Sequence, residues 1–405
     1  MTIQELDKQS EEQALKQLEV IKRGSLEIIP EAELLAKLKS SIRNSKPLRI
    51  KLGVDPSTAD LHLGHTVILE KLRTFQDLGH QVLFLIGDFT AQIGDPTGRS
   101  ETRKNLTREE VLKNAKTYSD QVLKILNPSK TQIVFNSQWT DNLKIQDVLK
   151  LTSMMTVARM LERDDFQKRY KEGHAIALHE FLYPIMQAFD SVQLRADVEL
   201  GGSDQKFNVL LGREYQKAYG QEPQVAVFMP LLEGTDGAQK MSKSLNNYIG
   251  LNEKPEEIFG KIMSISDKLM YRYYELLTGE DLKMIKELHP RESKARLGGI
   301  LVDRFYDSDT AKDVAEKFDA VFSRKLVPDN IPEVIINSKQ IPLTKLLAEQ
   351  NLATSLSEAR RLIVQGGVQV DGEKIIDTAF VVEGKKEITI KAGKRKFLKV
   401  SFKQS

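Results

Sequence analysis

Two histidines three residues apart give the first chemical pattern of the chain. His62 and His65 lie in the stretch VDPSTADLHLGHTV, where apolar residues at helical spacing begin. Both imidazoles are therefore expected near the N-terminal end of a helix, where backbone N–H groups and the helix dipole bind phosphate. Gly64 has no side chain, so a base or a phosphate can approach the backbone there closely. The pattern indicates phosphate handling; two surface histidines beside a turn remain an alternative at this point.

Two lysines form a second group about 175 residues further along the chain. Lys240 and Lys243 lie in the stretch EGTDGAQKMSKSLNN, whose glycines and polar residues predict a loop. Lysines on such a loop can close over a bound polyphosphate and neutralise its charge. The alternative is a solvated loop that carries lysines and serines.

A third group has the spacing of one helix face. Tyr183, Gln187 and Asp190 are four and then three residues apart, and Pro184 fits a helix that begins there. A core-facing stripe would not include Gln and Asp without partners, because burying unpaired polar groups is costly. The face therefore lines a binding site or faces solvent. Asp95 follows the apolar run VLFLIG, where a loop that contacts ligands is expected.

The elements around these residues predict an α/β fold. A strand at 48–54, a helix at 66–78 and a strand at 82–87 make a βαβ unit of a parallel sheet. Ligands bind beyond the carboxyl ends of such strands. We expect a Rossmann-type parallel-sheet domain with an N-terminal helical extension, an α-helical domain and a small α+β domain. The expected bounds are 1–245 for the parallel-sheet domain, 246–325 for the helical domain, 326–340 for a linker and 341–405 for the α+β domain.

Composition narrows the function classes. The 405 residues include no cysteine and only six histidines, none in a repeated metal-ligand spacing, so we expect neither disulfides nor a dedicated metal site. No run of about 18 apolar residues occurs, and the charged N-terminus lacks the pattern of a secretory signal, so we expect a cytoplasmic protein without a membrane span. From Thr354 to Ser405, eleven Lys and Arg face six Asp and Glu, an excess of 11 − 6 = +5. Such an end indicates polyanion binding, with a solvated charged surface as the alternative.

The histidine and lysine motifs together resemble the class I aminoacyl-tRNA synthetases. HLGH matches their first signature, and KMSKS from Lys240 to Ser244 matches the second in full. The resemblance implies that a carboxylate attacks the α-phosphorus of ATP, with His62, His65, Lys240 and Lys243 as catalytic residues. ATP would be a substrate that arrives with Mg²⁺, and no permanent cofactor is implied. Ser57 corresponds to a position that helps to hold the γ-phosphate, and Gly64 would also contact ATP.

The middle of the chain is similar to the bacterial tyrosyl-tRNA synthetases in particular. The pattern YxxxQxxD is followed by GGSDQ. The resemblance implies that Asp190 accepts the hydroxyl hydrogen of L-tyrosine. The other residues that it implies for binding tyrosine are Asp95, Tyr183, Gln187 and Gln205. Gly202 and Asp204 would bind the ribose of the adenylate. One position departs from the family: where many members have a tyrosine that contacts the substrate hydroxyl, this chain has Lys51, which could be paired to a carboxylate.

The C-terminal stretch SLSEARRLIVQGGVQVDGEKI resembles the small RNA-binding domain named after ribosomal protein S-four. The basic residues implied for RNA binding are Arg360, Arg361, Lys394, Arg395 and Lys396. Together the resemblances imply a catalytic domain over 1–245, an α-helical anticodon-binding domain over 246–325 and an RNA-binding domain over 341–405. The expected partners are therefore tRNA(Tyr), L-tyrosine and ATP, and family members are usually homodimers. Two alternatives stay open: a tryptophanyl-type synthetase, and a non-catalytic RNA-binding paralogue.

Overall fold

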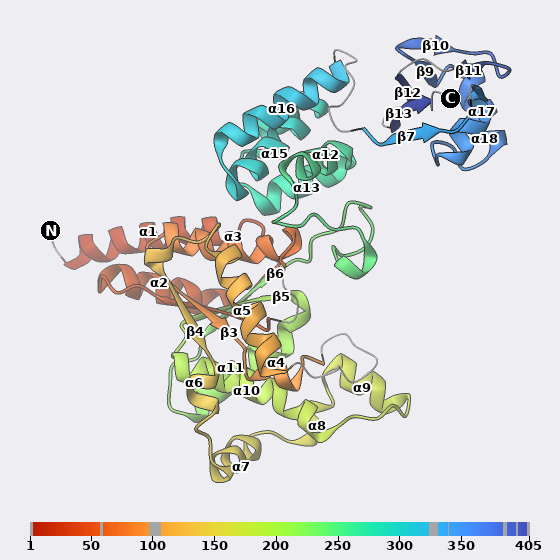
Figure 1. Ribbon diagram of the computed structural model, residues 1–405. Helices are drawn as coiled ribbons and strands as arrows, with labels where there is room; N and C mark the ends of the chain where they lie inside the picture. The colour runs from red at the N-terminus through yellow and green to blue at the C-terminus, as the bar shows by residue number, and fades with distance from the viewer. Residues whose placement is uncertain are drawn as a thin grey trace. The chain divides into compact units, whose positions relative to one another are not determined.

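The computed structural model describes most of the chain. The described ranges are 3–56, 60–96, 107–323, 331–338, 340–383, 387–393 and 396–402. Ser57, Lys394 and Arg395, which the sequence singled out, lie outside these ranges. The chain divides into two compact units, Met1–Ala315 and Glu316–Ser405 (Figure 1).

The first unit is built on a six-stranded sheet. The strand order is β1 (Glu27–Ile29), β6 (Val225–Met229), β5 (Val198–Gly202), β2 (Arg49–Val54), β3 (Gln81–Ile86) and β4 (Thr131–Phe135). All neighbours pair in parallel except β1, which is antiparallel to β6. The chain runs outward from β2 through β3 to β4 and then returns to β5 on the other side of β2. Ligands bind at such a reversal point, so the gap between β2 and β5 is where a site is expected.

Helices follow the strands of this sheet and cover it. The helix α3 connects β2 to β3, α11 connects β5 to β6, and the segment between β4 and β5 carries several helices that end in the long, largely buried α10. The bounds of the helices before β6 are α1 (Ile3–Lys22), α2 (Glu31–Arg43), α3 (Leu63–Asp77), α4 (Thr90–Ile93), α5 (Arg108–Val122), α6 (Ser137–Thr140), α7 (Ile145–Ser153), α8 (Val157–Met160), α9 (Asp164–Lys171), α10 (Leu178–Leu194) and α11 (Lys206–Ala218).

Pro184 lies inside α10 and does not start it. The helix begins at Leu178, where the side chain of Glu180 accepts a hydrogen bond from the N–H of Ala177 at 2.8 Å. Glu180 is also ion-paired with Arg169 at 2.5 Å, so tertiary contacts hold this first turn in place.

Helices follow the sheet, in agreement with the α-helical domain that the sequence predicted after the parallel-sheet domain. Its members are α12 (Pro255–Ser264), α13 (Asp267–Leu277), α14 (Leu282–Glu287), α15 (Pro290–Phe305) and α16 (Ser308–Ser323). Tyr273 and Tyr274 are completely buried, and the hydroxyl of Tyr274 donates to the carbonyl of Ser293 at 2.6 Å, which joins α13 to α15.

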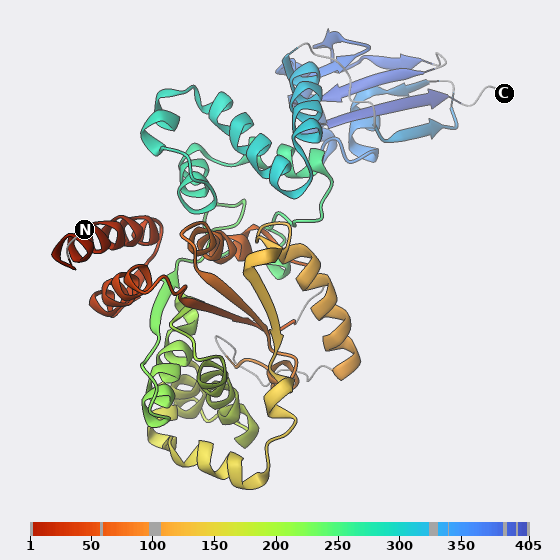
Figure 2. The same ribbon diagram turned by 90° about the vertical axis from the view of Figure 1, so that its left-hand side faces the viewer.

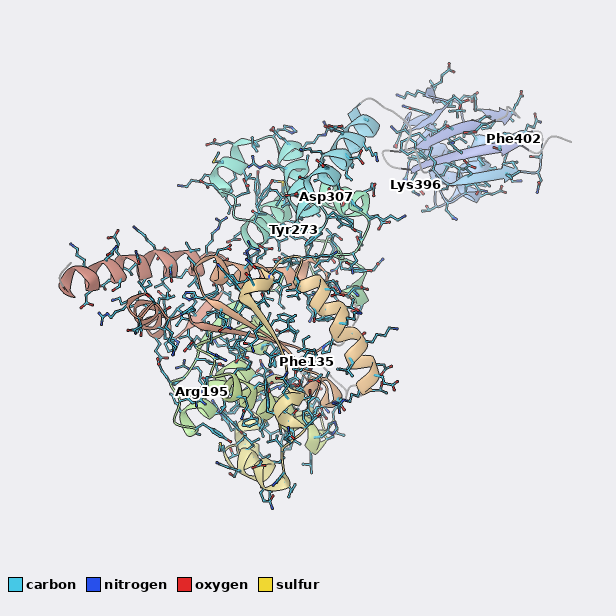
Figure 3. The ribbon with its side chains drawn as sticks, turned by 60° about the vertical axis from the view of Figure 1, so that its left-hand side comes forward. Phe135, Arg195, Tyr273, Asp307, Lys396 and Phe402 are labelled. Atoms are coloured by element: carbon cyan, nitrogen blue, oxygen red, sulfur yellow. The ribbon has the colours of Figure 1, made fainter. Side chains whose placement is uncertain are left out.

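The second unit is a small α+β domain with its own core. Its five-stranded sheet has the order β10, β9, β12, β13, β7, and β8 pairs with β11; Figure 2 shows the larger sheet with its strands side by side. The bounds are β7 (Glu333–Ile336), β8 (Gln340–Pro342), α17 (Leu343–Glu349), α18 (Leu356–Val364), β9 (Val368–Val370), β10 (Glu373–Ile375), β11 (Val381–Glu383), β12 (Ile388–Ala392) and β13 (Lys396–Phe402). Figure 3 labels Lys396 and Phe402 at the two ends of β13. The strand β7 falls within the predicted linker and pairs in parallel with β13.

The architecture agrees with the predicted fold class of a parallel-sheet domain, a helical domain and a small α+β domain. Among the helices described, none is long and apolar enough to cross a membrane.

Candidate active site

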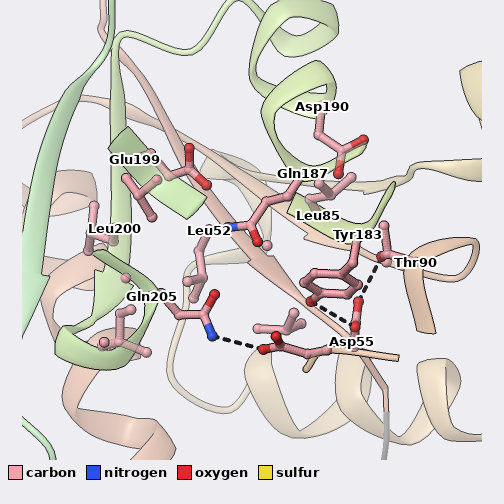
Figure 4. A pocket seen from close by; sticks show the side chains of 18 of the residues that line it. Leu52, Asp55, Leu85, Thr90, Tyr183, Gln187, Asp190, Glu199, Leu200 and Gln205 are labelled. Atoms are coloured by element: carbon pink, nitrogen blue, oxygen red, sulfur yellow. Dashed lines mark hydrogen bonds between the residues drawn. The ribbon is translucent and has the colours of Figure 1, made fainter. Parts of the chain in front are cut away.

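A cavity of about 280 Å³ opens at the carboxyl ends of β2 and β5, at the reversal point of the sheet (Figure 4). Its wall includes every residue that the sequence predicted for binding tyrosine: Asp95, Tyr183, Gln187, Asp190 and Gln205. His65 and Gly202 also line it. The structure therefore brings together groups that lie more than 100 residues apart in the chain.

Asp190 is buried at one end of this cavity. Its Oδ1 accepts a hydrogen bond from Trp139 Nε1 at 2.8 Å, and its Oδ2 accepts one from Asn136 Nδ2 at 3.3 Å. Burial raises the pKa of the Asp190 carboxyl to about 7, against the lowering effect of Lys51 and of the two donors. Sequence reasoning missed Asn136 and Trp139, although Asn136 directly follows β4, at the sheet edge where ligand-binding side chains gather.

Lys51 lies behind this end of the cavity and has no exposed surface. Its Nζ is 2.9 Å from the carboxylate of Glu199 and donates to Ser191 Oγ at 2.7 Å and to the carbonyl of Gln187 at 3.1 Å. The sequence left open whether Lys51 is paired to a carboxylate. The structure shows that it is, and the partner is Glu199 on the neighbouring strand β5.

The other end of the cavity holds two carboxylates. The Tyr183 hydroxyl donates to Asp55 Oδ2 at 2.9 Å, and Thr90 donates to Asp55 Oδ1 at 2.8 Å. Burial and the nearby Asp55 raise the pKa of the Tyr183 hydroxyl well above its usual value, so the group stays protonated. Because its hydrogen points to Asp55, its oxygen lone pairs can accept from a ligand. Asp55 was not predicted, although its place directly after β2 was a signal.

Asp95 is held by neighbours from two other segments. Gln205 Nε2 donates to Asp95 Oδ2 at 2.9 Å, and Arg163 Nη2 lies 3.6 Å from Oδ1. Arg163 also donates to Asn208, whose amide donates to Gln205 at 3.0 Å. These contacts fix the Asp95 carboxylate at this end of the cavity.

The two histidines cap the N-terminus of α3. His62 Nδ1 accepts from the N–H of Gly64 at 3.2 Å, His65 Nδ1 accepts from the N–H of His62 at 3.2 Å, and the rings are 4.0 Å apart. Burial lowers the pKa of His62 to about 3 and that of His65 to about 4. Both rings are therefore neutral at pH 7, and acceptance at Nδ1 assigns their hydrogens to Nε2. A Cβ on residue 64 would lie 2.9 Å from the His62 ring, which explains the glycine.

Backbone hydrogen bonds join the segment just after the second motif to the first motif. Leu63 donates to the carbonyl of Ile249 at 2.9 Å, and Leu251 donates to the carbonyl of Leu61 at 3.1 Å. Lys243 Nζ lies 3.3 Å from the carboxylate of Asp60, and Lys240 is exposed. The structure thus places the lysine loop beside the histidine motif.

Asp204 follows β5 with Gly202 before it. Burial raises the pKa of the Asp204 carboxyl, and the nearby Lys240 opposes this rise. A Cβ on residue 202 would come within 2.8 Å of the Asp204 carboxylate, so only glycine fits without displacing it. No group of three or more His, Cys, Asp or Glu suited to holding a metal ion occurs within the described ranges.

The predicted RNA-binding residues lie in the second unit. Arg360 and Arg361 are exposed on α18. Lys396 is exposed at the start of β13, and its Nζ donates to the carbonyls of Asn351 at 2.9 Å and Leu352 at 3.1 Å. Lys396 therefore holds the loop between α17 and α18, whereas the two arginines are available to a ligand.

Comparison with known proteins agrees with this geometry. The family described as tRNA synthetases class I (W and Y) matches residues 43–323, and the Tyrosine--tRNA ligase SYY-like C-terminal domain matches residues 324–400. A Tyrosine--tRNA ligase of Carboxydothermus hydrogenoformans is 55% identical over 404 residues, covering 96% of this chain and 98% of that protein. One of Syntrophotalea carbinolica is 54% identical over 399 residues, covering 96% and 98%.

Solved structures share the fold at lower identity. A C-terminally truncated mitochondrial tyrosyl-tRNA synthetase of Aspergillus nidulans is 21% identical with a TM-score of 0.66, covering 79% of this chain and 100% of that one. The tryptophanyl-tRNA synthetase of Plasmodium falciparum is 18% identical with a TM-score of 0.54, covering 70% and 80%. Since the fold is common to both kinds of enzyme, the fold does not determine the substrate, and the side chains of the cavity do.

Proposed function

The chain belongs to the class I tRNA synthetases (W and Y), and we infer that it works as a tyrosine-tRNA ligase. It activates L-tyrosine with ATP to tyrosyl-adenylate and then transfers the tyrosyl group to the 3′ end of tRNA(Tyr). The single observation that carries the choice of amino acid is Asp190, a buried carboxylate with two donors at one end of the cavity.

The cavity has an end for each polar group of tyrosine. Asp190 accepts the hydrogen of the phenolic hydroxyl, and Asp95, Tyr183 and Gln187 surround the ammonium group. Gln205 holds Asp95 in position and orients the amino acid. Phenylalanine would leave the Asp190 carboxylate without its donor, and the indole of tryptophan would need more room at this end than the hydroxyl does.

In the first step, a carboxylate oxygen of tyrosine attacks the α-phosphorus of ATP. The new bond joins this oxygen to phosphorus, and the bond from phosphorus to the bridging oxygen of pyrophosphate breaks. The neutral His62 and His65 donate Nε2–H hydrogen bonds to phosphate oxygens, since both Nδ1 atoms already accept from the backbone. Lys240 and Lys243 neutralise charge on the departing pyrophosphate, and Mg²⁺ arrives with ATP.

Gly202 and Asp204 bind the ribose of the adenylate. The glycine permits close approach of the backbone, and the Asp204 carboxylate accepts hydrogens from the ribose hydroxyls. Ser57 contributes to holding the γ-phosphate. These groups position the reactants and stabilise charge, and no covalent enzyme intermediate is required.

In the second step, a ribose hydroxyl at the 3′ end of tRNA attacks the tyrosyl carbonyl, and AMP leaves. The basic C-terminal domain supplies phosphate contacts, chiefly through the exposed Arg360 and Arg361, and Lys394, Arg395 and Lys396 follow more than 30 residues later in the same domain. The enzyme acts in the cytoplasm, where tRNA charging takes place in bacteria.

We propose that the enzyme is a homodimer. Large apolar side chains are exposed on the segment between β4 and β5, and the four most exposed of them are Ile145, Val157, Tyr170 and Leu178, each at least 63% exposed. A dimer interface that buries this segment would remove these side chains from water. Sedimentation equilibrium tests this: a monomer at every concentration would contradict it.

The test of the proposed activity is ATP/pyrophosphate exchange with each of the twenty amino acids. Exchange with tyrosine alone is expected. Exchange with tryptophan instead would identify a tryptophanyl-type enzyme, and the absence of exchange with any amino acid would favour a non-catalytic RNA-binding protein.

A further inference from the structure

The ammonium group of Lys51 is a buried charge that no step of the proposed reaction uses. It is held by Glu199 on β5 and by two groups of α10, the Ser191 hydroxyl and the Gln187 carbonyl. These two positions flank Asp190 on the helix. Lys51 thus ties the turn that carries Asp190 to the sheet beneath it.

Glu199 is equally well held. One of its oxygens pairs with Lys51, and the other accepts from the Ser191 hydroxyl at 2.8 Å and from the side-chain amide of Gln224. Glu199 also lines the cavity; in Figure 4 it lies with Asp190 at the upper end, away from Asp55 and Gln205. This end of the cavity therefore combines two carboxylates with one lysine.

The charge of Asp190 depends on both members of the pair. Burial is the largest influence and raises the pKa of the Asp190 carboxyl, Lys51 is the strongest influence that lowers it, and Glu199 raises it further. The other groups that act on it are the neutral donors Trp139 and Asn136. An opposite charge nearby favours ionisation of a carboxyl, and a like charge opposes it.

We propose that Lys51 and Glu199 form a positioning pair that sets the charge of Asp190 and thereby the selectivity for tyrosine over phenylalanine. The inference rests on the proposed function, in which Asp190 receives the substrate hydroxyl. An ionised Asp190 binds this hydroxyl strongly and is left with one donor fewer when phenylalanine is bound, whereas a protonated Asp190 loses most of this preference. Selectivity therefore falls as pH drops through the pKa of Asp190, and the pair decides at which pH this happens.

The experiment measures kcat/KM for tyrosine and for phenylalanine in ATP/pyrophosphate exchange from about pH 5 to about pH 9. The ratio of the two values should fall in acid with a single midpoint. Glu199→Gln removes the like charge and should move this midpoint to lower pH, whereas Lys51→Met removes the opposite charge and should move it to higher pH. Each shift should be roughly one pH unit or more. Opposite shifts are not expected from loss of packing alone.

Lys37→Met is the matched control, because Lys37 is also a buried lysine but pairs with Glu222 at 2.8 Å, outside the cavity wall. Its midpoint should equal that of the unaltered enzyme. A selectivity ratio that does not change with pH, unmoved midpoints, or shifts of both variants in one direction would overturn the proposal.

The same assay also covers the case in which one variant does not fold, and it distinguishes failure of the pair from failure of the proposed function. If Lys51→Met does not fold, Glu199→Gln decides alone, since it keeps the side-chain volume and must lower the midpoint. If the unaltered enzyme does not exchange with tyrosine, the proposed function fails; if it does exchange and the midpoints stay in place, only the role of the pair fails.

Discussion

Replacing Asp190 by Asn tests the tyrosine site with little change in volume. The Asn oxygen should turn toward Trp139 Nε1, which makes the shorter of the two present bonds at 2.8 Å. The amide nitrogen then faces Asn136 and the substrate hydroxyl, so a charged acceptor is replaced by a neutral donor. A hydrogen bond to a charged group is worth about 1.5–3 kcal/mol, which corresponds to roughly 10- to 150-fold in kcat/KM.

The assay is ATP/pyrophosphate exchange with tyrosine and with phenylalanine as alternative substrates. The value of kcat/KM for tyrosine should fall by the factor above, while that for phenylalanine should stay the same or rise, because the charged carboxylate that lacks the donor of the substrate is gone. Asp77→Asn, at an exposed position at the end of α3, is the matched control and should change neither value. Equal losses of kcat/KM with both amino acids would show that Asp190 supports the fold of the cavity and does not bind the substrate hydroxyl.

Three further predictions concern other parts of the molecule. His65→Ala or Lys243→Ala should lower the rate of adenylate formation far more than the affinity for tyrosine, as stopped-flow and equilibrium binding would show; equal losses would indicate ground-state contacts. Removing everything after Ser323 should preserve exchange but weaken tRNA charging and flatten the salt dependence of tRNA affinity, and unchanged charging at every salt concentration would exclude a role in RNA binding. Burial lowers the pKa of His80 from 6.5 to about 4, so its contribution to stability is complete above pH 6.5 and is lost as pH falls toward 4. His80→Gln should therefore reduce the acid-induced loss in the free energy of unfolding by up to about 3 kcal/mol, measured by denaturant titration at each pH, and a parallel pH dependence would contradict this.

The sequence was informative wherever a motif is contiguous or lies on one face of a helix. The family and the fold class are confirmed, and the residues that the resemblance implied for tyrosine line one cavity. The roles given to these residues stay predictions. The partners of Asp190 were not predictable, because Asn136 and Trp139 lie more than 50 residues before it and meet it only after the sheet has formed.

Two local features also needed tertiary information. Pro184 suggested the start of a helix, but contacts of Glu180 hold an earlier turn, so α10 begins at Leu178. The predicted linker contains β7, whose four residues are too few to give a strand pattern and which pairs in parallel with β13 from the far end of the domain. A truncation is for this reason better placed before β7 than after it.

The backbone bonds between the histidine motif and the segment just after the lysine motif bear on how the chain tolerates insertions. Leu63 with Ile249, and Leu251 with Leu61, are linked through main-chain N–H and carbonyl groups, which every residue other than proline can supply. The relative position of the histidine and lysine motifs is consequently fixed at their own ends and not by the length of chain between them. The length of chain between the two motifs can therefore change in its loops while the motifs keep their register, and side chains at the joining positions can vary without separating them.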